Sequence, residues 1–463
     1  MNEPHHPQED SLLLPKASHD VAASKKTFFN FLRFSVLFAS SPCCVLACMA
    51  LATARLGAIG AWQSGIIFLM YTISSITGAT YVVKKLGARN SIILGMMLYS
   101  VYVGCFIVAT SIEFLAAPAA ILGASVGGVG GGFLWTAQGV YFSQAAEQYA
   151  KQTGKECSEV TSYLAGIFAC IYLAIEAMLE ILPTILIQAG IVSWTTIFGV
   201  YSVIAFLAMV GMLWVQDYPP TDSTSSTENV SIWYKVLAAW HLLYDDPKMR
   251  YMIGVNAAFG FSGAFVHSFV NGEVVRIVLH DDESKYVGAL SAWSAIVSSF
   301  MSLVFERLSR SYGNGSVQIL GSMAYLCIVL PFLLLPDLEH QWGWRLLLLV
   351  YFMYGAGRAT FEGSLRAIFA DFFAYEREGA YSNIVLQSGL TSTVGFIVTY
   401  SGLECKSSSP YCISYNDGTH HNVLILELGV VITSILAIFG YLRAAQIFKD
   451  EQERKEGDVT EKI

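Results

Sequence analysis

Long apolar segments constrain this chain more than any other feature of its sequence. Each holds about twenty residues, the length that a helix needs to cross roughly 30 Å of hydrocarbon. A transmembrane barrel is excluded, because its strands alternate apolar and polar residues. The segments are residues 29–53, 60–82, 91–110, 114–142, 161–187, 194–216, 251–274, 286–305, 316–336, 343–369, 380–402 and 423–445. Only 13% of the 463 residues are charged, about half the share in soluble proteins. We therefore predict an all-α polytopic membrane protein with twelve transmembrane helices.

Lys and Arg residues are distributed unevenly over the loops between these segments. With twelve helices both termini lie on one side, and most of the 27 Lys and Arg residues fall in the tails or loops of that side. The other side holds Arg55, Arg276, Lys285, Arg345 and Lys406. Because cytoplasmic loops are enriched in basic residues, we predict that both termini are cytoplasmic. The first 27 residues lack the apolar core of a cleavable signal peptide, so we expect the first helix to act as an internal signal anchor.

The chain divides into two halves around its longest interior polar segment. We expect a cytoplasmic N-terminal tail at residues 1–28, a six-helix bundle at 29–217, a cytoplasmic linker at 218–250, a second six-helix bundle at 251–446 and a cytoplasmic C-terminal tail at 447–463. Within the linker, the stretch Ile232–Tyr244 places on one helical face the residues Trp233, Val236, Leu237, Trp240 and Tyr244. This pattern fits an amphipathic helix at the membrane interface, or equally a helix packed on the bundle.

The two halves share a sparse internal repeat. GGFLWTAQG begins at Gly131 in the fourth segment, and GAGRATFEG begins at Gly355 in the tenth. The matches are Gly131, Thr136 and Gly139 with Gly355, Thr360 and Gly363, and Gln138 stands opposite Glu362. The loops after the second and eighth segments also correspond, Lys84–Leu86 with Glu306–Leu308. Parallel six-helix repeats build the major facilitator fold, which has a central cavity between its halves. We predict that fold here.

Glycines recur in the fourth segment at Gly123, Gly127 and Gly131. A spacing of four places them on one helical face, where small residues let two membrane helices approach closely. A phosphate-binding loop would need a strand before the glycines and a Lys-Ser or Lys-Thr pair after them. An apolar helix and Phe133-Leu134-Trp135 stand there instead, so we predict a helix-packing surface.

Ionisable and polar residues inside the apolar segments indicate a candidate central cavity. Burying such groups in a membrane is costly, and they commonly mark functional sites. We expect the cavity to contain Gln138, Glu176, Glu180, His267, Arg358 and Glu362. Glu427, near the non-cytoplasmic end of the last segment, is a weaker candidate.

The spacing of the charged residues predicts specific interactions. Glu176 and Glu180 share a helical face, and two adjacent carboxylates at low dielectric cannot easily both ionise. One of them would hold a proton, unless Glu180 lies at the helix end and reaches water. Arg358 and Glu362 are also four apart, which allows an intrahelical ion pair. That pair could serve the cavity or be a purely structural pin, and His267 could equally be a hydrogen-bonded packing residue.

Other motifs bear on location and covalent structure. Cys405 and Cys412 share a non-cytoplasmic loop, where a disulfide is plausible. Glu9, Leu13 and Leu14 fit an acidic dileucine sorting signal, which favours an endolysosomal or vacuolar membrane over the plasma membrane. We find no metal-binding, cofactor-binding or catalytic motif and expect no enzyme. The acidic net charge of −8 argues against nucleic-acid binding.

Two stretches resemble a known family. Leu134–Tyr141, LWTAQGVY, resembles the LWTAQGxY signature of the Unc-93-like branch of the major facilitator superfamily. Ala370–Phe373, Arg377–Asn383 and Gln387–Gly389 resemble the same family. The signature residues here are Trp135, Thr136, Gln138, Gly139 and Tyr141.

The resemblance implies a non-transporting role. Members of this family are described as regulatory partners of potassium channels, with a part in potassium homeostasis, or as escorts of other membrane receptors. The loop after the second segment also lacks the acidic residue usual in major facilitator transporters, reading KKLGAR from Lys84.

Two functions therefore remain open. The first is a regulatory or trafficking partner of an ion channel or other membrane protein. The second is a proton- or cation-coupled secondary transporter of ions or small solutes, which the intramembrane charges favour. Beyond the lipid bilayer, the expected partner is accordingly a channel or receptor subunit, or else a small solute or cation.

Overall fold

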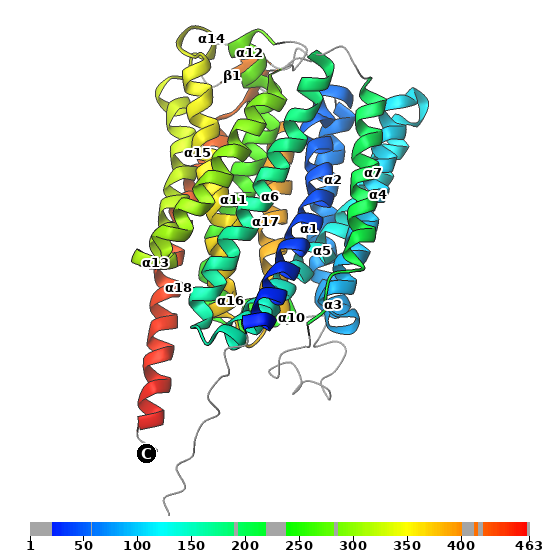
Figure 1. Cartoon of the computed structure of the whole chain (residues 1–463). Coiled ribbons are helices and arrows are strands. Elements are labelled where there is room, and N and C mark those ends of the chain that lie inside the picture. The colour runs from blue at the N-terminus through cyan, green and yellow to red at the C-terminus, as the bar shows by residue number, and fades with distance from the viewer. Residues whose placement is uncertain are drawn as a thin grey trace, which may run out of the picture.

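The protein is a bundle of long helices, seen in a computed structural model (Figure 1). The structure describes residues 21–56, 58–188, 193–218, 238–281, 286–400, 412–414 and 420–460.

The first half is built from helices that follow one another through short turns. They are α1 (Val21–Leu56), α2 (Ala58–Ser74), the π-helix η1 (Ser75–Ala79), α3 (Thr80–Leu86), α4 (Ala88–Ser111), the 3-10 turn η2 (Glu113–Leu115), α5 (Ala116–Thr153), α6 (Cys157–Gln188) and α7 (Trp194–Met212). Together α2, η1 and α3 form one crossing, so this half contains the six predicted crossings.

The second half follows the short helix α10 (Ala238–Asp245). It consists of α11 (Pro247–Ala264), the π-helix η3 (Phe265–Val274), α12 (Val275–Leu279), α13 (Val287–Leu334), α14 (Leu338–Gln341), α15 (Trp344–Glu362), α16 (Ser364–Phe372), α17 (Arg377–Tyr400) and α18 (Leu424–Thr460). Strands β1 (Cys412–Ser414) and β2 (His420–Asn422) form a small antiparallel hairpin before α18, a minor departure from the all-α prediction.

Gly313 divides α13 into two crossings. Its φ of 79° and ψ of 157° are not helical, and a residue without Cβ adopts a positive φ without strain. Gly87, which joins α3 to α4, has nearly the same dihedrals, φ 80° and ψ 163°. These two glycines therefore mark equivalent turns in the two halves. The predicted alignment of Lys84–Leu86 with Glu306–Leu308 is wrong by about one helical turn.

The predicted fold class is confirmed. Nine helices in the described ranges are long and apolar enough to cross a membrane, and α13 is one of these although it crosses twice. The crossings formed by α15 with α16 and by α17 complete the twelve, and both are rich in buried polar residues. Large apolar side chains cover the outside of the bundle, such as Trp62, Phe114 and Phe439, as expected for a surface in contact with lipid.

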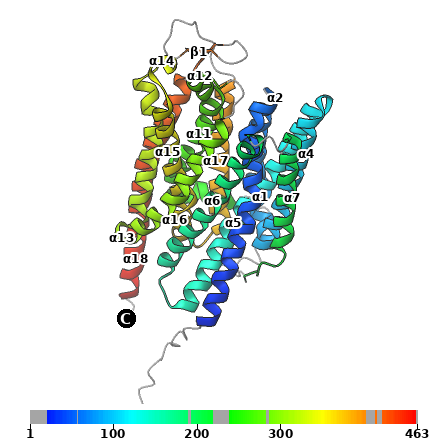
Figure 2. The ribbon, with the colours of Figure 1, turned by 45° about the horizontal axis from the view of Figure 1, so that its top comes forward.

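The described ends of the chain lie at the same end of the bundle. Figure 1 shows α1 beginning and α18 ending at the bottom, together with α10, whereas α12, α14 and β1 lie at the top. We call the bottom the terminal end. In both views the first half, coloured blue to green, stands beside the second half, coloured yellow-green to red (Figure 2).

The glycine-rich part of α5 packs against two neighbouring helices. A Cβ on Gly123 would lie 2.7 Å from the Cβ of Cys105 in α4, and one on Gly127 would lie 2.9 Å from the Cβ of Tyr102. Gly131 instead faces the ring of Tyr71 in α2, at 2.8 Å. Because so little space remains for a side chain, these glycines set the distances between α5, α4 and α2.

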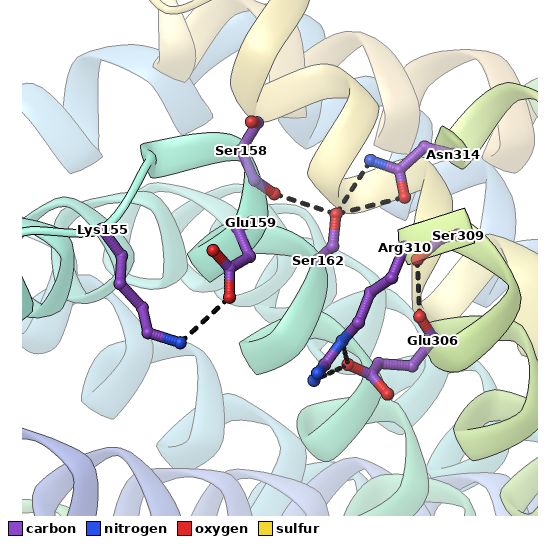
Figure 3. Close-up of polar contacts among 8 residues, drawn as sticks. All are labelled: Lys155, Ser158, Glu159, Ser162, Glu306, Ser309, Arg310 and Asn314. Carbon is purple, nitrogen blue, oxygen red and sulfur yellow. Dashed lines mark hydrogen bonds and ion pairs between the residues drawn. The ribbon is translucent and has the colours of Figure 1, made fainter. Parts of the chain in front are cut away.

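The two halves meet along α6 and α13 as well as along α17, which packs on α2 and α5. Near the terminal end, Asn314 donates a hydrogen bond to Ser162 at 3.0 Å (Figure 3). Gly166 lets α6 approach the Glu306 side chain, since a Cβ there would lie 2.6 Å from the Glu306 Cβ. Arg310 on the same turn of α13 donates to Glu306 at 2.6 Å. The first and second halves are therefore tightly joined at this seam.

The predicted linker helix forms in part. Helix α10 begins at Ala238, and residues 219–237 lie outside the described ranges. It buries Ala238, Ala239 and Leu242, and Asn383 of α17 donates to the Ala239 carbonyl at 2.8 Å. The helix thus packs on the bundle through these residues, and Trp240 and Tyr244, the described residues of the predicted face, are exposed.

Of the residues in the predicted disulfide and sorting signal, only Cys412 lies in the described part of the chain. Cys412 forms a disulfide bond, while its predicted partner Cys405 lies outside the described residues. Glu9, Leu13 and Leu14 lie outside them too.

Replacing Gly127 by Leu should destabilise the bundle. The new side chain would collide with Tyr102, and overpacking of this kind costs about 1–3 kcal/mol. We expect a lower unfolding temperature and lower membrane abundance for Gly127→Leu. Gly104→Leu is the matched control, because a Cβ on Gly104 meets nothing within 4 Å. Equal unfolding temperatures for the two variants would contradict the packing role.

Candidate functional site

A central cavity lies between the two halves. Its volume is about 140 Å³, and its walls come from α1, α2, α4, α5 and α6 of the first half and from α11, η3, α15, α16 and α17 of the second. Aromatic side chains dominate the lining, among them Tyr71, Tyr99, Trp135, Tyr172, Phe259 and Phe361. The charged residues in the wall are Arg358, Glu362 and Arg366. The cavity is therefore an aromatic chamber with a few fixed charges.

Arg358 forms a two-pronged ion pair with Glu176 across the halves. The two terminal nitrogens of Arg358 in α15 donate to the two carboxylate oxygens of Glu176 in α6, at 2.6 and 2.7 Å. Both side chains are buried, with 6% and 1% of their surfaces exposed. Parallel hydrogen bonds between a guanidinium and a carboxylate are among the strongest polar contacts in proteins. The pair joins the second half to the first at the cavity wall.

Small residues in α15 bring Arg358 to this position. Gly355 lies against the Ser294 carbonyl of α13, and Gly357 lies against the ring of Tyr325, so neither could carry a side chain. The Ser298 hydroxyl donates to the Gly355 carbonyl at 2.7 Å, which fixes α15 on α13. The sequence GAGR is thus a close-packed turn that ends in a buried cation.

Arg366 links the repeat-related residues Gln138 and Glu362. It donates to Glu362 at 2.8 Å and to the side-chain oxygen of Gln138 in the first half. Its guanidinium lies 5.0 Å from the ring centre of Trp135 and 5.7 Å from that of Phe168, within cation–π range. Arg366 is therefore the second tie between the halves.

The predicted intrahelical pair between Arg358 and Glu362 does not form. Arg358 pairs with Glu176, and Glu362 pairs with Arg366, which is four residues further on. A break at Gly363 separates α15 from α16, so helical spacing alone was a poor guide to the partner of Arg358. Arg366, which is not among the predicted cavity residues, lies in the cavity wall and bonds to both halves.

The remaining predicted cavity residues fall into two groups. His267 lines the cavity, and its Nε2 lies 3.2 Å from the Tyr354 hydroxyl. Gln138, Glu176 and Glu180 are not in the lining and lie behind it.

Two buried carboxylates lack partners. Glu180 is 4% exposed, and its Oε2 has no hydrogen-bond partner within the described residues. Glu427 in the first turn of α18 is 2% exposed and has a similarly unpaired Oε2. Glu427 is not part of the cavity lining.

Three of the five signature residues of α5, Trp135, Gln138 and Gly139, face the second half. Trp135 lies in the cavity wall under Arg366. One helical turn further, Gly139 is in contact with the ring of Tyr381 of α17, which leaves no room for a side chain. Tyr381 in turn lies 3.1 Å from the hydroxyl of Ser143 and donates to the Arg366 carbonyl. The signature thus forms one wall of the cavity and its floor toward the terminal end.

Thr136 and Tyr141 point elsewhere. Both are fully buried. The Tyr141 hydroxyl donates to the Gln216 carbonyl at 2.8 Å and accepts a hydrogen bond from Asn30 at 2.9 Å. These contacts fix α5 to α1 and to the segment after α7, so they stabilise the first half internally.

Two ion pairs close the terminal end below the cavity. Lys84 of α3 pairs with Glu376 at 2.8 Å, and Glu147 of α5 pairs with Arg377 of α17 at 3.0 Å. Each joins one half to the other. We call these two contacts the terminal-end ion pairs. These contacts could not be predicted from the sequence, because no spacing rule or motif relates two residues that are 292 positions apart, or 230 in the second pair.

No group of three or more metal-binding side chains occurs in the part of the chain that the structure describes. The site chemistry visible here is therefore hydrogen bonding, ion pairing and aromatic contact.

Comparison with known proteins identifies related sequences. The profile of the Major Facilitator Superfamily matches residues 27–399. The chain is similar to Protein unc-93 homolog A of Bos taurus, with 23% identity over 385 residues that cover 74% of this chain and 79% of the relative. It is also similar to UNC93-like protein 3 of Arabidopsis thaliana, with 21% identity over 75% of each chain. The predicted resemblance to the Unc-93-like family is confirmed, and neither the family nor these relatives are of an enzyme type.

Solved structures share the fold. The transporter FucP in its outward conformation matches with a TM-score of 0.63 and 12% identity, over 90% of this chain and 99% of that one. The proton:xylose symporter XylE matches with a TM-score of 0.64 and 11% identity, over 92% and 96%. At these identities the similarity establishes the fold alone.

Removing Arg358 should strongly destabilise the protein. Arg358→Met leaves Glu176 buried without its partner, and breaking a buried pair costs about 3–5 kcal/mol. The double variant Arg358→Met/Glu176→Met should recover most of this loss, since no buried charge is left unpaired. Thermal unfolding of the purified variants measures both effects, with the exposed Lys449→Met as control. If the double variant is as unstable as the two single changes added together, the pairing is not what holds this seam.

Proposed function

Because the chain belongs to the Major Facilitator Superfamily, we propose that it binds a small, uncharged polar solute in the central cavity and carries it across a membrane by alternating access. The observation that carries this proposal is a chamber between the two halves whose fixed charges are already paired. The fold is that of a transporter family, and its cavity occupies the interface at which such proteins bind solutes.

The charge balance of the cavity favours an uncharged solute. The two guanidinium groups each have a carboxylate partner, Glu176 for Arg358 and Glu362 for Arg366. A charged solute would have to lose its hydration without meeting an unpaired counter-charge, which is unfavourable at low dielectric. An uncharged molecule with hydroxyl or amide groups would bind to polar atoms while its apolar faces pack on the aromatic walls.

The terminal-end ion pairs support alternating access. The loops after the second and eighth crossings lack the acidic residue usual in transporters. Here the basic residue Lys84 stands in the first half, and the carboxylate of Glu376 comes from the second. Compared with such transporters, the acidic residue comes from the opposite half, yet the contact still joins the two halves of the bundle. The four side chains keep 9–21% of their surfaces exposed, so water at the terminal end can solvate them when the pairs break during a cycle.

The distribution of Lys and Arg supports a cytoplasmic terminal end. In that orientation the terminal-end ion pairs close the cavity toward the cytoplasm. The dileucine motif at Glu9, Leu13 and Leu14 favours an endolysosomal or vacuolar membrane, in which the other end of the bundle would face the lumen.

A second candidate function is that of a regulatory or trafficking partner of an ion channel or other membrane protein. Its support is the similarity to Unc-93-like proteins, together with the α5 stretch LWTAQGVY, which resembles their signature. The end of α18 also projects beyond the bundle at the terminal end, where another protein could contact it (Figure 1). Purification in mild detergent would recover a stoichiometric membrane partner if this function holds, and repeated recovery of the chain alone would count against it.

Trp135→Ala should weaken solute binding about tenfold or more. Its ring lies in the cavity wall, and loss of one aromatic contact is worth about 0.5–1.5 kcal/mol beyond the buried area. Thermal-shift screening of the purified protein against uncharged polar solutes identifies a ligand, and flux into proteoliposomes tests its transport. Trp62→Ala is the control, because Trp62 is 68% exposed on the outside of α2. Flux equal to that of empty liposomes for every solute that binds would refute transport.

Loss of the terminal-end ion pairs should open the floor of the cavity. Ser143 is buried there beside Tyr381, so a cysteine at this position reports access from the terminal end. In a background that lacks the exposed Cys157, Ser143→Cys should resist a water-soluble maleimide. Labelling should become several-fold faster when Lys84→Ala and Arg377→Ala are added. If labelling rates are unchanged, these ion pairs do not control access.

A further inference from the structure

We propose that Glu180 is a proton-binding site whose protonation state decides which of two carboxylates holds Arg358. The inference deepens the proposed function and rests on it, since a proton bound beside the cavity would couple transport to pH. The evidence for the site itself comes from the surroundings of the side chain.

Glu180 is buried without compensation for a negative charge. It is 4% exposed, and its Oε2 has no hydrogen-bond partner among the residues described. It lies one helical turn after Glu176 on α6, so the two carboxylates share a face. An unpaired ionised carboxylate in such a place is strongly disfavoured, and the neutral acid is the form that needs no counter-charge.

The ionisable groups that face Glu180 from neighbouring helices are already engaged. From α7, the Tyr201 hydroxyl donates to the Leu179 carbonyl at 2.6 Å. From α15, the Tyr351 hydroxyl donates to Asn271, and both terminal nitrogens of Arg358 donate to Glu176.

The other neighbouring side chains also have partners. From α1, the Cys43 thiol lies 3.6 Å from the Tyr172 carbonyl. From α15, the Tyr354 hydroxyl lies beside His267. From α13, Gly288 packs on the Glu180 backbone, since a Cβ there would lie 3.2 Å from the Glu180 carbonyl oxygen. Within the described structure, therefore, no cation is left to balance an ionised Glu180, and these tyrosine hydroxyls already have partners.

Among the described residues, Arg358 is the cation that acts on both carboxylates, since it pairs with Glu176 and lies within electrostatic reach of Glu180. When Glu180 is protonated, Arg358 pairs with Glu176 alone, which is the arrangement in the structure. When the proton leaves Glu180 Oε2 for water, a second negative charge competes for the same guanidinium. Arg358 belongs to the second half and both glutamates to the first. Loss of the proton would thus change the strength and geometry of the tie between the halves.

Infrared spectroscopy of the full-length protein in nanodiscs tests the proposal without any solute. A protonated buried carboxyl gives a carbonyl stretching band that shifts in heavy water. We expect part of this band to persist at neutral pH in the native chain and to disappear in Glu180→Gln. It should also weaken in Glu176→Gln, because Arg358 is then free to pair with an ionised Glu180. A merely structural role for Glu180 would not produce this second effect.

Glu427→Gln is the matched control. Glu427 is also buried with an unpaired oxygen, but it lies in α18 and not beside Glu176 and Arg358, so its loss should leave the Glu180 component and its response to Glu176→Gln unchanged. Absence of the band at neutral pH, or a band unaffected by Glu180→Gln, would overturn the proposal. Absence of solute flux in a protein that shows the expected band would refute transport and leave the proton site standing.

Discussion

The arrangement of the whole molecule depends on pairing buried charges across the interface of its halves. Arg358 and Glu176 lie 182 residues apart in sequence, and burying either charge without a partner would strongly destabilise the bundle. Their contact requires α15 and α6 to stay at one distance and one rotation. The glycines of α15 and the seam between α6 and α13 supply that alignment. Close backbone packing and charge pairing therefore depend on each other, because the packing of the helices brings the two charges together.

Arg366 extends the same principle through the internal repeat. Gln138 and Glu362 occupy equivalent places in the two halves, and both bind this guanidinium. The Unc-93-like signature in α5 thereby acquires a physical meaning: Trp135 supports the Arg366 guanidinium, Gln138 accepts its hydrogen bond, and Gly139 admits Tyr381. A stretch that resembles a phosphate-binding loop by composition is in fact a packing surface followed by a cavity wall.

Much of the fold could be predicted from sequence because each crossing is a local property. A run of apolar residues long enough to span the bilayer must form a helix there, and the repeat in α5 and α15 was enough to indicate two halves. The choice of partners could not be predicted in the same way. Spacing along α15 favoured Glu362 for Arg358, yet the true partner lies in the other half. The terminal-end ion pairs were missed for the same reason: Lys84 and Glu376 are brought together only by the tertiary fold.

The central claim is that polar contacts across the interface hold the halves closed at the terminal end. It is tested most directly by measuring the distance between spin labels at Lys151 of α5 and Lys449 of α18, both exposed, in nanodiscs. Lys84→Glu, which sets two carboxylates against each other, should add a population with a longer distance. The charge exchange Lys84→Glu/Glu376→Lys should restore the original distribution. Identical distributions in all three proteins would contradict the account.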